Sequence, residues 1–204
     1  MSGAGPFPRS RCALLALAAT MGPAPAHAHL SSTGMGPIYD GMTHFVTSPE
    51  DLVPALALAL LAGLRGAGHS RRVLVALPGA WLLGGLIGLT GPATTLGTAL
   101  SPMWFLLLGG LVAADARLSP RVIVGLAIVV GLCQGYGNGS GMGRSGFAVV
   151  VLLGMVFAVF VLVALAAAFV VRLRAAWARV AVRVAGSWIA ASGLLLFGWA
   201  ARRG

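Results

Sequence analysis

Histidine and acidic side chains gather in one short segment near the N-terminus. Residues 27–51 hold three of the four histidines and three of the four acidic residues of the chain. Asp40 and His44 are four residues apart, so a helix there would place the carboxylate and the imidazole on one face. A mixed nitrogen and carboxylate set suits nickel, copper, zinc or cobalt better than magnesium or calcium. The segment therefore predicts a site for a divalent transition metal.

His29 is the third candidate ligand because of what precedes it. Residues 1–28 have the features of a cleaved secretory signal peptide: Arg9 and Arg11 form a positive region, an apolar stretch follows, and the segment ends in the small-x-small pattern Ala-His-Ala. Cleavage after this pattern makes His29 the first residue of the mature chain. Its imidazole and its free α-amine could then both bind the metal, once the amine is deprotonated.

A purely structural interpretation of these three residues is open as well. Asp40 would stabilise the first turn of a short helix, His44 would lie at the membrane surface, and His29 would have no fixed partner. The clustering of the three in a chain with few other metal-binding side chains favours the metal site.

The composition is that of an integral membrane protein. Hydrophobic residues make up 58% of the 204 residues, charged residues make up 9%, and the mean hydropathy is +0.95. The formal net charge of +10 comes from arginine alone, since the 14 basic residues include no lysine. The arginines lie in short clusters between apolar segments, so we expect the lipid bilayer, and not nucleic acid, as the partner.

Six apolar segments follow the polar N-terminal part, joined by short polar connections. At ~1.5 Å per residue, ~18 residues cover most of a ~30 Å hydrocarbon core. We therefore predict an all-α fold: a polytopic membrane helix bundle of six transmembrane helices, forming a single domain over 29–204 with an external N-terminal segment at 29–48. The first and fourth segments are short: each could be an interrupted transporter helix, or equally a tilted or poorly bounded span. The six segments are 51–64, 73–89, 96–114, 122–135, 147–171 and 184–201.

Arginines in the connections predict the orientation. Nine of them follow the first, third and fifth segments, whereas the opposite connections and the C-terminus carry only Arg144, Arg202 and Arg203. The positive-inside rule places the nine on the cytoplasmic side and the mature N-terminus outside. We therefore expect a multi-pass protein of the bacterial inner (cytoplasmic) membrane, with its mature N-terminus on the periplasmic or external side.

Four further polar residues are candidates for a path leading from the external site, or for groups that support its ligands. The run Ser-Pro-Glu-Asp at 48–51 is typical of a helix start, which is a sufficient account of Glu50 and Asp51, although acids on the outer side would also concentrate cations. Gln134 and Asn138 lie in a glycine-rich stretch at the end of the fourth segment. Their amides could line a cavity, and a flexible loop is the alternative.

Nothing in the sequence indicates catalysis. A Ser-His-Asp order, paired catalytic acids and an HExxH pattern are all missing, and the glycine-rich stretch lacks the Lys-Ser/Thr ending of a phosphate-binding loop. We predict that the protein is not an enzyme and has no organic cofactor. Cys12 lies in the predicted signal peptide, and Cys133 then remains alone, so neither a disulfide nor a cysteine metal site is expected.

The chain resembles the HupE/UreJ family over most of its mature length. Members of this family are membrane proteins associated with hydrogenase and urease operons, and are regarded as probable nickel permeases. The resemblance rests on His29, the run Gly-Pro-Ile-Tyr-Asp-Gly at 36–41 before His44, the helix entry at 48–52, the run Gly-Tyr-Gly-Asn-Gly at 135–139 and the last-helix sequence at 183–191.

The best-known members carry the first-helix pattern His-Pro-x-x-Gly-x-Asp-His, which this chain keeps in part. His44 matches the first histidine, and Glu50 stands for the aspartate. Asp51 stands for the last histidine, and a carboxylate in place of an imidazole makes the site harder and more anionic. Gln134 and Asn138 take the place of the histidines of the later helices, so the chain resembles a divergent branch.

These features together predict a permease that captures a divalent transition metal as its substrate at His29, Asp40 and His44. Nickel is the first candidate, with cobalt, copper and zinc as alternatives, and the resemblance implies a metalloenzyme maturation system as a partner. The alternative function is a non-transporting membrane accessory or scaffold protein that binds a metal or a metalloprotein at its outer face. A purely structural membrane subunit is the third interpretation.

Overall fold

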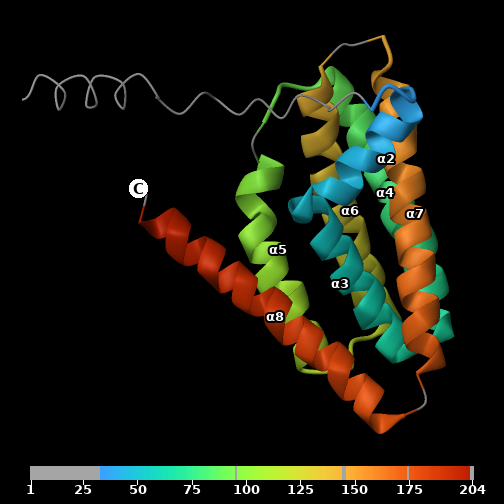
Figure 1. Cartoon of the computed structure of the whole chain (residues 1–204), viewed down its shortest axis with the longest axis vertical. Helices are drawn as coiled ribbons and strands as arrows, with labels where there is room; N and C mark the ends of the chain where they lie inside the picture. The colour runs from blue at the N-terminus through green and yellow to red at the C-terminus, as the bar shows by residue number, and fades with distance from the viewer. Residues whose placement is uncertain (1–32, 95, 144–145, 174, 203–204) are drawn as a thin grey trace, which may run out of the picture.

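The computed structural model describes residues 33–94, 96–143, 146–173 and 175–202. The predicted signal peptide and His29 lie outside these residues and stay predictions. The described part contains seven α-helices and no strand (Figure 1). The helices are α2 (Pro37–Thr47), α3 (Pro49–Arg65), α4 (Ala67–Thr90), α5 (Leu96–Ala113), α6 (Pro120–Met142), α7 (Ala148–Arg172) and α8 (Ala176–Ala201).

The six predicted apolar segments correspond to helices α3 to α8, in order. Four of these, α4, α6, α7 and α8, are long and apolar enough to cross a membrane by themselves. Helices α2 and α3 meet the same criterion only as a pair, bent by 75° at a break, and α5 contributes the shorter apolar helix Ala99–Ala113. The structure therefore confirms an all-helical, multi-pass arrangement with four or five candidate spans, while the count of six stays a prediction.

The structure corrects the predicted loop at the end of the fourth segment. The glycine-rich stretch 135–141 is helical and extends α6 to Met142. Its glycines are tolerated because α4 approaches closely: a Cβ at Gly135 would overlap the carbonyl of Trp81, and one at Gly139 would overlap the carbonyl of Gly85. Glycine weakens an isolated helix, but here it permits backbone contact that larger residues would prevent.

Helices α4 and α6 run in the same direction along this contact. Gly131 of α6 lies against Leu77 and Trp81, whereas Gly135, one turn later, lies against Trp81 and Gly85. Gly84 and Gly88 of α4 make the reciprocal approach to α6. Small residues thus line both sides of the contact, which is the packing expected between helices that have no hydrophobic driving force in lipid.

Helix α2 packs against α7 and is fixed near its C-terminal end by an aromatic contact with α4. A Cβ at Gly41 would overlap the carbonyl of Val151, and one at Gly154 would overlap that of Ile38, so the two backbones nearly touch. Phe45 is fully buried and meets Trp81 edge to face, with ring centroids 5.7 Å apart. These contacts hold α2 firmly on the bundle, directly before the bend into α3.

Helices α5 and α8 lie to one side of the other five (Figure 1). Their contact again depends on glycine: Gly109 of α5 faces the backbone of α8, while Gly186 and Gly193 of α8 face α5. The remaining surface of α8 carries exposed apolar side chains such as Trp188 and Leu195. Such a surface suits lipid better than water.

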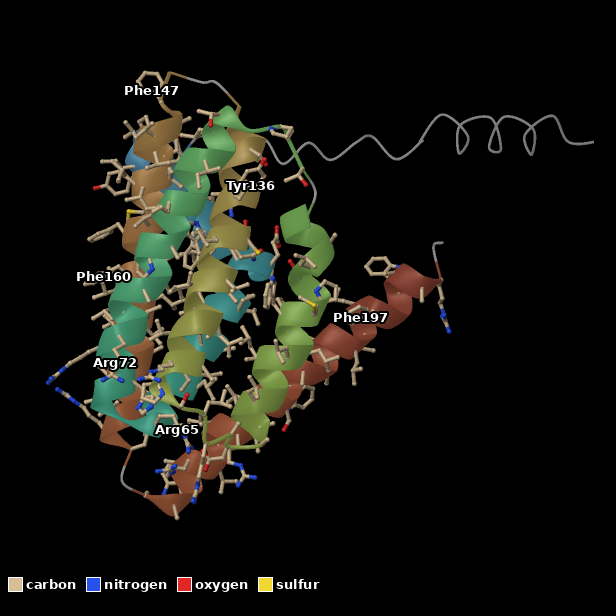
Figure 2. All side chains as sticks on the ribbon, turned by 180° about the vertical axis from the view of Figure 1, so that it is seen from behind. Arg65, Arg72, Tyr136, Phe147, Phe160 and Phe197 are labelled. Carbon is tan, nitrogen blue, oxygen red and sulfur yellow. The ribbon has the colours of Figure 1, made fainter. Side chains whose placement is uncertain are left out.

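Most of the described arginines gather at one end of the bundle. Figure 2 shows Arg65 and Arg72 at the end opposite to Tyr136 and Phe147. Asp115 lies at the arginine-rich end, where it forms ion pairs with Arg65 and, at 3.6 Å, with Arg179. The separation of charge fits the predicted cytoplasmic position of this end, and the orientation itself stays a prediction.

The glycine contact between α4 and α6 gives a prediction about stability. We expect Gly135→Ala to lower the free energy of unfolding by about 1–3 kcal/mol or more, because the new methyl group overlaps the main chain of Trp81. Gly125→Ala is the matched control in the same helix, since no atom lies within 4 Å of a Cβ built there. The measurement is the thermal unfolding midpoint of each purified variant in detergent, and equal midpoints would contradict the packing described above.

Candidate functional site

The candidate site is built around one buried carboxylate. Asp51, in the first turn of α3, is only 3% exposed. The Nδ2 group of Asn138 donates to both carboxylate oxygens at 3.0 Å, and Nε2 of Gln134 donates to Oδ1 at 3.2 Å. Hydrogen bonds to a charged acceptor are stronger than those between neutral groups. The two amides of α6 thus hold the carboxylate in a fixed orientation inside the bundle.

The bend between α2 and α3 puts Asp51 in this position. Ser48 has an extended backbone and interrupts the helix, and Pro49 restarts it, as expected for proline at a first helical position. The carbonyl of Ser48 accepts a hydrogen bond from the amide of Asp51 at 3.0 Å, whereas the Ser48 side chain makes no capping bond. The predicted helix start is confirmed, and it forms without a capping hydrogen bond from the Ser48 side chain.

Helix α6 supplies its two amides from one face. Gln134 and Asn138 are four residues apart, and Nδ2 of Asn138 also donates to the main-chain carbonyl of Gln134 at 2.9 Å. Nε2 of Gln134 donates to the main-chain carbonyl of Glu50 at 2.5 Å. Glu50 therefore takes part through its backbone and not through its carboxylate.

One acceptor in the cluster is left without a donor. Gln134 is 1% exposed, and its Oε1 atom has no hydrogen-bond partner within the described part of the chain. A buried acceptor without a donor costs about 1–3 kcal/mol. Together with the carboxylate of Asp51, this oxygen could contribute to binding a cation that enters the cluster. The atoms that could bind a metal ion there are all oxygens, which are hard ligands.

The predicted capture residues Asp40 and His44 lie on α2, before the bend. They share one face of the helix, as their spacing predicts. Oδ1 of Asp40 accepts from the amide of Thr33 at 2.5 Å and from its hydroxyl at 2.7 Å. The imidazole of His44 is half-buried and has no hydrogen-bond partner in the described residues. Asp40 is thus tied to the preceding segment, while His44 is available to a ligand.

The structure leaves the predicted three-residue metal site untested. Among the described residues, no three His, Cys, Asp or Glu side chains gather closely enough to hold a metal ion. The predicted set needs His29, which lies outside those residues. By contrast, the structure brings three side chains of the predicted path set together, those of Asp51, Gln134 and Asn138, while Glu50 joins them through its main-chain carbonyl.

Sequence reasoning missed two features of the site. The burial of Asp51 was not expected, because a local account of helix starts already explains an acid in a first turn. An acid next to a long apolar run is the signal that could have indicated it, since such residues face the bundle interior. Thr33, the partner of Asp40, stands in no recognisable pattern, and nothing in the sequence marks it.

Comparison with known proteins identifies one family. A profile described as HupE / UreJ protein matches residues 15–196, which is most of the chain. No curated protein and no solved structure matches the chain. The resemblance noted from the sequence is thereby confirmed.

The hydrogen bonds of the cluster predict that the side chain of Asp51 contributes more to the free energy of unfolding than that of Glu50. We expect Asp51→Asn to lower the free energy of unfolding by about 1–3 kcal/mol, because an amide hydrogen would then face the donors of Asn138 or Gln134. Glu50→Gln removes the same charge one residue away and keeps the main-chain carbonyl that Gln134 uses. We expect it to change the unfolding midpoint little. The same loss in both variants would show that charge alone, and not the hydrogen-bond network, matters here.

Proposed function

The chain belongs to the HupE/UreJ family, and on that premise we propose that it is a membrane permease for a divalent transition metal. Nickel is the first candidate substrate, with cobalt, copper and zinc as alternatives. The metal is captured at the outer face by His29, Asp40 and His44 and passes to the cluster formed by Asp51 and the amides of α6. The protein is not an enzyme and serves a metalloenzyme maturation system.

One observation carries this proposal: a carboxylate is buried among membrane-type helices next to a break in one of them. An ionisable group within a membrane bundle is costly to maintain and commonly marks an ion or substrate path. Transporters commonly form their sites where a helix is interrupted. Asp51 meets both conditions, since it is 3% exposed and lies three residues after the break at Ser48.

The order of the residues along the chain supports a path for the metal from α2 to the buried cluster at Asp51. Asp40 and His44 lie on α2, the bend follows, and Asp51 comes in the first turn of α3. Helices α2 and α3 are joined by the single residue Ser48, so a ligand that leaves His44 is close to the entrance of α3. The half-buried His44 thus connects the outer segment to the buried cluster.

The oxygen ligands of the cluster suit the passage of a metal ion better than its tight binding. A metal at Asp51 must displace the amide hydrogens of Gln134 and Asn138, and rotation of the two amides would then present their oxygens. Amide and carboxylate oxygens are harder ligands than imidazole and bind nickel less strongly. A weaker inner site lets the ion move on after the nitrogen ligands at the outer face have selected it.

The accessory or scaffold function is the second candidate, and one observation favours it. Both acids of the proposed path already have protein donors, because Thr33 satisfies Asp40 and the α6 amides satisfy Asp51. A protein with this arrangement could bind a metal or a metalloprotein at its outer face and conduct nothing. Metal flux separates the two functions.

We expect purified protein in sealed proteoliposomes to admit radioactive nickel, and we expect His44→Ala and Asp51→Asn to slow entry by about tenfold or more, the factor equivalent to ~1.4 kcal/mol. His69→Ala is the matched control, since His69 lies at the start of α4, at the arginine-rich end. Equal entry in all variants at equal reconstitution would overturn the proposed path. Metal binding without entry would favour the scaffold function.

Binding at the outer face is tested separately by isothermal titration. The mature protein, with its N-terminus verified by sequencing, is titrated with nickel, cobalt, copper and zinc beside a His29→Ala form cleaved at the same bond. We expect one of the four metals to bind tightly and the mutant to bind it about tenfold more weakly or worse, through loss of one imidazole ligand. A correctly cleaved, folded protein that binds none of the metals would refute both the permease and the metal-binding scaffold.

A further inference from the structure

A cavity at the arginine-rich end contains none of the residues of the metal site proposed above. It has a volume of about 470 Å³ and lies where α4 passes the start of α6. Figure 2 shows Arg72 at this end of the molecule. The cavity is lined by Arg72, Ser119, Pro120, Arg121 and Val124.

The charge of the cavity is positive and has no counter-charge in the described part of the chain. Arg72 and Arg121 both line it, and no acidic residue does. Asp115, the acid at this end, pairs instead with Arg65 and Arg179. Two guanidinium groups without a carboxylate partner favour an anion, and their planar donors match the oxygens of a phosphate.

Helix packing fixes the two guanidinium-bearing segments relative to each other. The parallel contact between α4 and α6 continues to this end, where Val73 and Ile123 are both fully buried next to the arginines. Helix α6 begins with proline at its first position, and Ser119 caps it by accepting from the amide of Val122 at 3.4 Å. Arg121 therefore projects from a rigid first turn and not from a loose connection.

An apolar stripe runs from each arginine along its helix. On α4, Arg72 is followed at helical spacing by exposed Val75 and Leu83. On α6, Arg121 is followed in the same way by exposed Ile128 and Leu132.

Each stripe contains a glycine at the same helical spacing, which keeps its surface shallow. Gly79 of α4 and Gly125 of α6 both lie in open space, with no atom within 4 Å of a Cβ built there. Such a surface can receive hydrocarbon next to the charged cavity.

We propose that this cavity binds the phosphate of an anionic phospholipid. Arg72 and Arg121 hold the phosphate, and the acyl chains lie along the apolar stripes of α4 and α6. A free phosphate ion would satisfy the arginines equally well but would make no use of the stripes. The combination of a positive cavity with continuous exposed apolar surface is what selects a lipid.

The test measures lipid binding by the full-length protein in detergent. Binding of phosphatidylglycerol, followed by native mass spectrometry, is compared with that of phosphatidylcholine, which has no net charge. We expect the double variant Arg72→Gln/Arg121→Gln to bind phosphatidylglycerol about tenfold more weakly, a change equivalent to ~1.4 kcal/mol. The control is Arg71→Gln/Arg172→Gln, which removes the same charge from two exposed arginines at the same end that do not line the cavity. It should bind as the unmodified protein does.

Three results would overturn the proposal. Equal weakening in both double variants would mean general attraction to a basic surface, and equal binding of the two lipids would mean that the charge of the lipid is not recognised. Inorganic phosphate that binds to the unmodified protein as tightly as phosphatidylglycerol does would identify a free anion as the ligand.

A second variant keeps the proposal testable if the double arginine variant fails to fold. Gly125→Leu fills the open surface beside the arginines and leaves both guanidinium groups in place. We expect it to weaken phosphatidylglycerol binding and to leave the binding of inorganic phosphate unchanged. Unchanged lipid binding in this variant would refute the place assigned to the acyl chains.

Discussion

The burial of the Asp51 carboxylate is the constraint on which the site depends. A charge among apolar helices is stable only with hydrogen-bond donors, and the nearest ones lie on α6, more than 80 residues further along the chain. Supplying them requires α3 to begin beside the C-terminal half of α6. The chain bends at Ser48, just before this contact, and α2 packs onto α7. One buried carboxylate thus links the bend, the packing of α2 and the position of His44.

The helices could be predicted from the sequence because their signals are local. Long apolar runs, Pro49 at a helix start, and arginines in the connections all lie next to the elements that they define. The glycine-rich end of α6 could not, because its stability comes from the backbone of α4, about 50 residues away. Asp51 shows the same limit, since its local context explains an exposed acid equally well and only the amides of α6 explain a buried one.

Three residues that the resemblance sets against histidines of the family meet in space. Asp51 is the one expected in place of the last histidine of the first-helix pattern, Gln134 and Asn138 are those expected in place of histidines of later helices, and the structure joins all three by hydrogen bonds. The amides donate what the carboxylate accepts, so the three side chains fit one another, although Oε1 of Gln134 has no donor within the described residues. Replacing one of the three alone would disturb this match.

The distribution of charge places a requirement on any cation path through this protein. A cation that leaves Asp51 towards the other end approaches several arginines, of which Arg65 and Arg179 are offset in part by Asp115. Arg72 and Arg121 have no such partner in the described residues. Their repulsion acts over about 8–10 Å at physiological ionic strength. The single negative charge of a lipid phosphate held between them would reduce this repulsion. Lipid binding at this cavity and metal exit at this end of the bundle would then favour each other through electrostatics.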